Sequence, residues 1–234
     1  MTYAAELDPR LDEGFEGTGF NIVKAKLRAI KLFPSLASVI KRFRFKNDSS
    51  AHGGIAHTDA ESYVAINASR FDRNDDNGQA AIVAHEAMHT EEKIFGKLGN
   101  LATDAVINAK IVLSGLMSSL SGFVDIPGAI SMGSYKIHKI LCEAWHYLQN
   151  PQIVPQQGLY DDPGGSFIDK SERDLTEEEC YLACFGNYDL WDRMVAWIGR
   201  RKEKEHQEML QHESTQVYNI DDYRRENYHD MAIA

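Results

Sequence analysis

Apolar residues recur at helical spacing along most of this chain. The spacing predicts a helix over residues 22–32, with Asn21 placed as its N-cap. Pro34 interrupts the periodicity, which resumes over residues 36–45. We therefore predict two helices, or one kinked helix, in this part of the chain.

The same spacing predicts helices in the second half of the chain. Residues 135–148 place their apolar side chains on one stripe. Thr176 and Glu179 form the pattern of a capping box, which opens another helix. Residues 188–212 predict a long helix whose apolar first half could dock on the main domain or on another subunit.

A short β-favouring stretch lies between these two groups of helices. Tyr63, Val64 and Ile66 are typical strand residues, and residues 54–56 could pair with them as a hairpin. An edge strand at this place could hold an extended peptide by strand addition. Taken together, the patterns predict an α-rich α+β fold with a small sheet.

The periodicity divides the chain into three parts. Residues 1–19 are acidic and have no sustained period, which predicts a loose N-terminal arm. Residues 20–186 predict the main domain, and residues 187–234 predict a C-terminal helix and tail that pack on the domain or on a partner. Residues 149–170 are rich in proline and glycine and are the best candidate for the rim or lid of a cleft.

Composition narrows the range of partners and compartments. The 234 residues carry a formal net charge of −10, which argues against a nucleic-acid partner. No stretch is apolar enough to cross a membrane, and the N-terminus lacks the features of a secretory signal. Three cysteines favour a reducing compartment over a disulfide framework. We predict a cytoplasmic protein and leave its oligomeric state open.

The candidate chemistry lies in an alanine-rich apolar stretch that reads His85-Glu86-Ala87-Met88-His89. Two histidines four residues apart on a helix project from one face, so both can bind the same metal ion. Glu86 can then take a proton from a water molecule that the ion has acidified. This H-E-x-x-H pattern predicts a Zn²⁺ site with His85 and His89 as ligands and Glu86 as the general base.

A catalytic zinc ion needs a third protein ligand, and Asp104 is our candidate. It stands among apolar residues in a second predicted helix, where a carboxylate without a partner would be costly. Asn108 follows four residues later on the same face and is predicted to hydrogen-bond a ligand without binding the ion itself. Glu91 and Glu92 are alternative third ligands.

Other histidines and a tyrosine are further alternatives. His52 and His57 lie upstream of the central helix and could approach the metal ion. Tyr135 or His138 could donate a hydrogen bond to a developing oxyanion. Placement in the core or on the surface is the simpler interpretation of each of these residues.

Four stretches also carry a resemblance to a known family. Residues 58–67, 83–89 and 100–108, and more weakly residues 175–181, resemble the metallopeptidase domain that in bacteria precedes a von Willebrand A-like domain. The resemblance implies a zincin-like fold, with His85, His89 and Asp104 as metal ligands and Glu86 as the base. It covers roughly residues 51–181.

Two departures from that family change the picture. Family members often carry another histidine where this chain has Ile94. If that histidine is a ligand in the family, the site of this chain depends wholly on Asp104. The von Willebrand-like half is also absent, which suggests a stand-alone or phage-encoded form acting in the cytoplasm of an infected host or on a virion. The sequence thus predicts a zinc metallopeptidase with a peptide or protein substrate. The alternative is a catalytically silent structural or interaction protein that keeps the same fold.

Overall fold

The computed structural model describes residues 7–49, 56–59, 61–71, 75–92, 94, 96–117, 123–150 and 174–230, with side chains described as far as residue 211. His52 and residues 151–170 of the predicted cleft rim lie outside these ranges.

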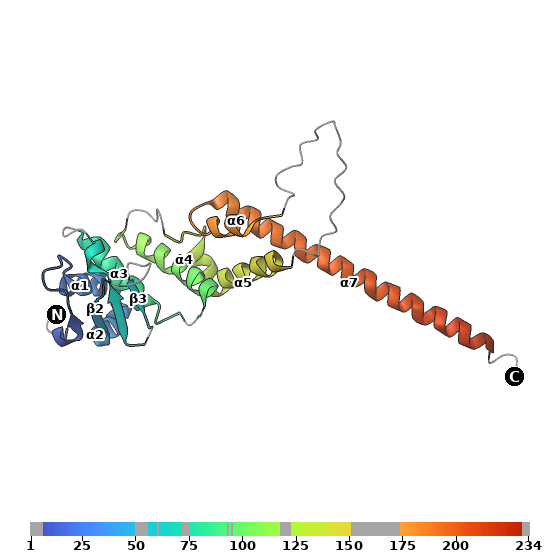
Figure 1. Cartoon of the computed structure of the whole chain (residues 1–234), viewed down its shortest axis with the longest axis horizontal. Helices are drawn as coiled ribbons and strands as arrows, with labels where there is room; N and C mark the ends of the chain where they lie inside the picture. Colours follow the sequence, from blue (N-terminus) through green and yellow to red (C-terminus); the bar gives the residue numbers. More distant parts are fainter. Residues whose placement is uncertain are drawn as a thin grey trace, which may run out of the picture.

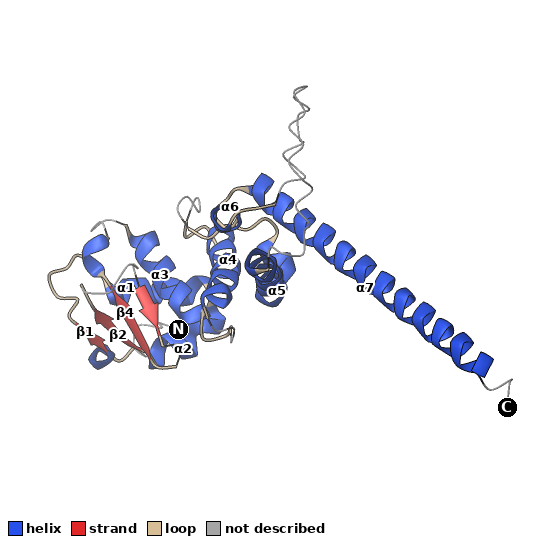
Figure 2. Ribbon diagram, turned by 45° about the vertical axis from the view of Figure 1, so that its right-hand side comes forward, coloured by secondary structure: helices blue, strands red, loops and turns tan. Residues whose placement is uncertain are grey.

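A small mixed sheet forms one end of the molecule. Its strands are β1 (Asp12–Glu13), β2 (Arg44–Asn47), β3 (Ala56–Thr58) and β4 (Tyr63–Ile66), in the spatial order β1-β2-β4-β3. The pairs β1–β2 and β2–β4 are parallel, whereas β3 and β4 are antiparallel (Figure 2). A hairpin is therefore confirmed here through the pairing of Ala56 with Ile66, whereas residues 54 and 55 of the predicted first strand lie outside the described residues. Among the described strands, β3 is at an edge.

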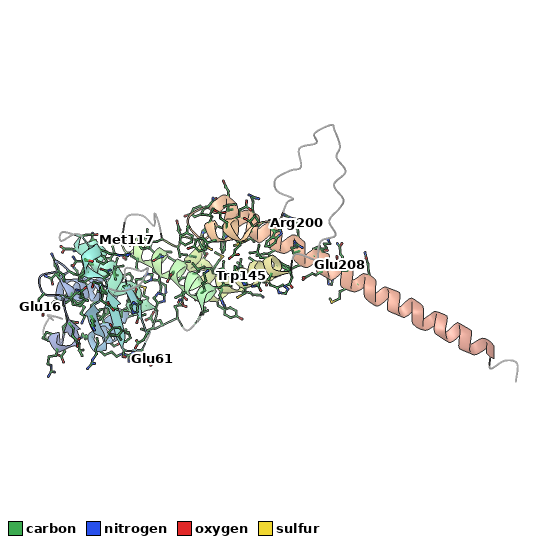
Figure 3. The ribbon with its side chains drawn as sticks, in the orientation of Figure 1. Glu16, Glu61, Met117, Trp145, Arg200 and Glu208 are labelled. Atoms are coloured by element: carbon green, nitrogen blue, oxygen red, sulfur yellow. The ribbon has the colours of Figure 1, made fainter. Side chains whose placement is uncertain are left out.

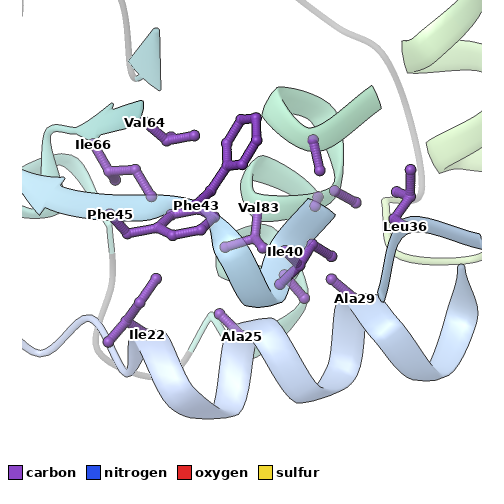
Figure 4. Packing of buried hydrophobic residues seen from close by; sticks show 14 of the residues in the cluster. Ile22, Ala25, Ala29, Leu36, Ile40, Phe43, Phe45, Val64, Ile66 and Val83 are labelled. Carbon is purple, nitrogen blue, oxygen red and sulfur yellow. The ribbon is translucent and has the colours of Figure 1, made fainter. Parts of the chain in front are cut away.

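Three helices pack on this sheet around the first hydrophobic core. They are α1 (Ile22–Leu32), α2 (Ala37–Arg42) and α3 (Asp76–Met88), with single 3₁₀ turns at Pro9–Leu11, Pro34–Leu36 and Ala68–Arg70. Figure 4 shows Ile22, Ala25 and Ala29 of α1 pointing toward the side chains of β2 and α3. Asn21 caps α1 through its side chain and Pro34 follows the end of that helix, as predicted.

The remaining helices enclose a second core. They are α4 (Lys97–Leu113), α5 (Ala129–Gln149), α6 (Glu177–Leu182) and α7 (Tyr188–Asp230). Trp191, Met194, Trp197 and Ile198 are buried in this core, so the apolar first half of α7 docks on the domain as expected. The rest of α7 projects beyond the other helices (Figures 1 and 2), and Figure 3 marks Glu208 on this part.

Helix α4 joins the two cores. Its Ile107 and Ile111 belong to the first core, and its Ala102, Ala105 and Val106 belong to the second. Residues on a single helix can reach both cores because they lie on different faces of it. The boundary between the cores therefore runs along α4, and the predicted site residues of α3 and α4 lie there.

Local sequence signals account for several helix boundaries. Thr176 and Glu179 form the predicted capping box at the start of α6. Helix α5 begins six residues before the predicted start at Tyr135, with a kink at Gly133, whose φ of 74° is left-handed. The straight part after the kink coincides with the predicted helix.

Two predictions for the N-terminal part were wrong. Residues 44–47 form the central strand β2, not the end of a helix, because Phe45 is buried between exposed Arg44 and Lys46 in a two-residue alternation. The second wrong prediction is the loose N-terminal arm. Its described part is packed on the domain, since β1 pairs with β2 and Phe15 lies in the first core. Lys26, which is buried, forms an ion pair with Asp12 and fixes this segment to α1.

The described residues thus form an α-rich α+β fold, which confirms the predicted fold class at that level. A search of the described helices for a membrane-spanning candidate finds none.

Candidate metal centre

Helix α3 carries the H-E-x-x-H pattern into the interior. It begins after Asp75, whose side chain accepts a hydrogen bond from the Gly78 N–H at 2.9 Å, so the acidic turn serves as an N-cap. Ala80, Ala84 and Ala87 are fully buried along the helix. Small side chains let neighbouring elements approach closely, so the histidines are held on a helix that is packed on several sides.

Helix α4 brings the third predicted ligand to the same place. It starts after Gly96, whose φ of 89° is a left-handed conformation that glycine adopts without strain. A Cβ atom on Gly99 would lie 2.9 Å from the carbonyl oxygen of Ile94, so only glycine permits this close approach of α4 to the preceding segment. The first turns of α4 are thereby fixed beside the end of α3.

Three side chains converge at the junction of these helices. The Nε2 atoms of His85 and His89 lie 3.1 Å apart. The Oδ1 atom of Asp104 lies 3.4 Å from the first of them and 3.1 Å from the second. Within the described residues, these three form the group of potential metal ligands whose donor atoms lie within 4.8 Å of one another. The structure therefore brings together the three residues that the sequence singled out.

The spacing of these atoms fits a tetrahedral zinc ion. Ligand atoms at about 2.0–2.1 Å from such an ion lie about 3.3 Å from one another. The three observed separations of 3.1, 3.1 and 3.4 Å are close to that value. Two imidazole nitrogens and a carboxylate oxygen are also donors that zinc accepts, and three protein ligands leave one position for water or substrate.

The electrostatics of the group favour a cation. Burial opposes ionisation of Asp104, but hydrogen bonds from His85 and His89 outweigh this effect and hold the pKa of the carboxyl well below its usual range. Burial lowers the pKa of His85, yet the hydrogen bond to Asp104 and the charges of Glu86 and Asp104 raise it overall. A carboxylate facing two imidazole nitrogens is satisfied by a proton or by a metal ion in their midst.

Solvent can reach the three candidate ligands. Their side chains are 17%, 19% and 29% exposed for His85, His89 and Asp104, respectively. They line a cavity of about 440 Å³ together with Glu86. A site with this exposure can admit both an ion and a substrate, whereas a closed structural zinc site could not.

Glu86 is the most buried acid of the site. It is 5% exposed, and burial raises the pKa of its carboxyl, while the neighbouring histidines work in the opposite direction. A carboxyl whose pKa moves toward neutrality is better suited to accept and return a proton at physiological pH. Its place on the cavity wall beside the histidines gives it access to a water molecule there.

Asn108 lies where it acts on His85, the place that the sequence predicts for a hydrogen-bond partner of a ligand. As an acceptor its side chain helps to raise the pKa of His85, and its Nδ2 atom donates to the carbonyl oxygen of Val124 at 3.0 Å. A partner that raises the pKa of an imidazole accepts from it, so the atom of Asn108 that acts on His85 is its amide oxygen. Such a partner fixes which ring nitrogen carries the proton and leaves the other free for a metal ion.

We expect the Asn108→Ala variant to bind zinc about 10–100-fold more weakly than the wild type, because the imidazole of His85 loses its orienting acceptor. Competition titration with a zinc chelator of known affinity measures this change. Asn100→Ala is the matched control: Asn100 lines the same cavity on α4, and its loss should leave zinc affinity within about twofold if only the Asn108 contact matters. Equal zinc affinity for wild type and Asn108→Ala would contradict the orienting role.

The structure also places the alternative residues. Glu92 lines the cavity, but its carboxylate accepts a hydrogen bond from Ser134 and lies 3.9 Å from the Lys110 ammonium. Glu91 is exposed, and Ile94 lies on the cavity wall. Among the described acids, Asp104 is therefore the one that contacts both histidines.

His57, a possible further ligand, lies in the metal cavity, whereas the possible oxyanion donors His138 and Tyr135 lie elsewhere. His57 is on edge strand β3 and lines the metal cavity opposite α3 and α4. His138 lines a second cavity and lies 3.3 Å from the Sγ atom of Cys142, whereas Tyr135 is 76% exposed. Neither of the last two lines the metal cavity, so the predicted oxyanion role finds no support from the described residues.

Sequence reasoning did not assign β3 as a cavity wall. All three residues of β3 and the following Asp59 line the metal cavity. The sequence predicts a strand here, but it does not predict where that strand lies relative to α3 and α4. That position depends on the packing of the whole sheet.

Comparison of the chain with protein-family models, with curated proteins and with solved structures finds no match. The proposed function therefore rests on the geometry of the site.

Proposed function

We propose that this chain is a zinc-dependent hydrolase of the zincin type, which cleaves a peptide or related amide bond. The observation that carries the proposal is the set of three separations, 3.1, 3.1 and 3.4 Å, between the candidate ligand atoms of His85, His89 and Asp104. The adjacent buried Glu86 adds the base that hydrolysis requires.

In this proposal His85, His89 and Asp104 hold the ion. When bound, zinc acidifies a water molecule and polarises the carbonyl group of the substrate. Glu86 accepts the proton of that water on its carboxylate and passes it to the departing amine. Asn108 keeps the imidazole of His85 in the required orientation.

Edge strand β3 offers a place for the peptide. Among the described strands it pairs only with β4, so it lies at an edge of the sheet. Its residues line the same cavity as the candidate metal ligands. An extended peptide that added to this edge would hold a substrate carbonyl near the metal ion. The exposed imidazole of His57 lies on this wall.

Metal analysis tests the proposal most directly. The protein purified after exposure to zinc at neutral pH is expected to hold about one zinc per chain and to cleave a mixture of peptides from digested cell protein. Mass spectrometry of the mixture detects new termini, and dialysis against a chelator should remove both zinc and cleavage. Absence of zinc after reconstitution would overturn the proposal.

A second candidate is an interaction protein that keeps the fold and the ion but not the activity. The supporting observation is α7, which extends beyond the second core and carries exposed Met209 and Leu210. Such a protein would bind zinc and cleave nothing in the peptide mixture. Metal content alone does not separate the two candidates, whereas cleavage does.

A further inference from the structure

A second cavity adjoins the metal cavity along α4. Its volume is about 370 Å³, which lies within the range of about 300–1,000 Å³ typical of ligand pockets. It is enclosed by α4, α5, α6 and α7, and its apolar wall comprises Leu98, Leu101, Leu141, Trp145, Leu148 and Met194. Figure 3 shows Trp145 among these helices.

The cavity is a partly open hollow with a mostly apolar wall, and it is not a void inside the core. Ala144, Cys180 and Cys184 are buried on its wall, and at these positions small side chains keep the space open. A larger residue at any of them would fill the cavity.

The two cavities meet at the start of α4. Gly96 lines both of them. Farther along the helix, Asp104 faces the metal cavity and Leu101 faces the apolar cavity. Residues three apart on a helix have Cβ atoms about 5–6 Å from each other. A peptide whose carbonyl group lies at the candidate ligands could therefore place a neighbouring side chain in the apolar cavity, since an extended chain advances about 3.3 Å per residue.

We propose that the cavity formed by α4–α7 receives a large apolar side chain, such as phenylalanine or leucine, of a peptide substrate whose scissile bond lies at the metal centre. The inference rests on the proposed function. It assigns the substrate class: peptides with a bulky apolar residue within one or two positions of the cleaved bond. Lys97, His138 and Glu177 also lie on the cavity wall and offer polar contacts to the backbone of such a peptide.

Tripeptide hydroxamates test this assignment on the zinc-loaded full chain. The hydroxamate group chelates the metal ion, and one phenylalanine is moved along an otherwise all-alanine chain. Burial of the phenylalanine ring is expected to strengthen binding about tenfold or more at the best position. Isothermal titration calorimetry measures the ratio of the two dissociation constants.

Variants of the cavity wall complete the test. Ala144→Leu fills the cavity from α5 and Leu101→Phe fills it from α4; both should bind the all-alanine hydroxamate like the wild type and lose the preference for phenylalanine. Gln149→Leu is the matched control, because it introduces the same leucine side chain at an exposed position of α5 that lines neither cavity. Thermal melting verifies folding, and either wall variant suffices if the other does not fold.

The outcomes separate the inference from the function on which it rests. Binding of the all-alanine hydroxamate with no gain from phenylalanine, or a gain that survives filling of the cavity, would overturn the apolar pocket while the metal site stands. Failure of every hydroxamate to bind the zinc-loaded protein would overturn the proposed function and the pocket with it.

Discussion

The Glu86→Gln variant is expected to cleave peptides about 10²–10⁴-fold more slowly than the wild type while it binds the same amount of zinc. Glutamine has nearly the shape of glutamate, so the packing around this 5% exposed side chain is retained. It cannot accept a proton from water, and the step assigned to Glu86 is thereby lost. Because Glu86 is not a predicted ligand, the ion should remain in place.

Peptide cleavage and zinc content have to be measured on the same preparation. Glu91→Gln is the matched control, since it removes the same charge from an exposed position five residues later. The control should cleave at the wild-type rate. Cleavage that persists undiminished in Glu86→Gln would mean that Glu86 is not the base. A wild type that binds zinc and cleaves nothing would favour the interaction protein.

The sequence predicted those parts of the molecule that depend on local patterns. His85 and His89 share a face because four residues make about one helical turn, whatever surrounds the helix. Asp104 was selected because an acid in an apolar helix needs a partner. The structure brings Asp104 to the two histidines, although the ion itself remains a prediction. Asn108, four residues after Asp104, acts on the pKa of His85 as an acceptor, and its role as an orienting partner stays a prediction.

The central strand β2 was missed because its signal is short. Arg44, Phe45 and Lys46 alternate as a strand does, but the helical periodicity predicted over residues 36–45 also extends to Phe45. Four residues cannot distinguish a period of 2.0 from one of 3.6. The pairing of β2 with β1 and β4, which decides the outcome, is made with segments far away in the sequence.

The two cavities could not be predicted from the sequence either, because they are formed by residues far apart in the chain. Leu101 and Trp145 both read as ordinary apolar helix positions, and nothing local shows that they line an open space. Glu92 is a comparable case. Its hydrogen bond to Ser134 spans 42 residues, so only the fold separates it from Asp104 as a candidate ligand.

The Asp104→Asn variant is expected to lose zinc affinity by more than the about 10–100-fold that loss of an orienting partner such as Asn108 causes. An amide oxygen carries no charge and is a much poorer zinc ligand than a carboxylate, and two histidines alone leave the ion with two protein ligands. Peptide cleavage should disappear with the metal. Competition with a chelator measures the affinity, and circular dichroism shows whether the helices persist.

Glu92→Gln decides between the two acids that line the cavity. It removes the same charge from the cavity wall, but its carboxylate faces Ser134 and Lys110 and is not among the acids that contact the histidines. Zinc affinity within about threefold of the wild type is therefore expected for this variant, a change far smaller than loss of a ligand would cause. If Glu92→Gln lost zinc while Asp104→Asn kept it, the third ligand would be Glu92. The contacts of Asp104 with His85 and His89 would then serve only the metal-free protein.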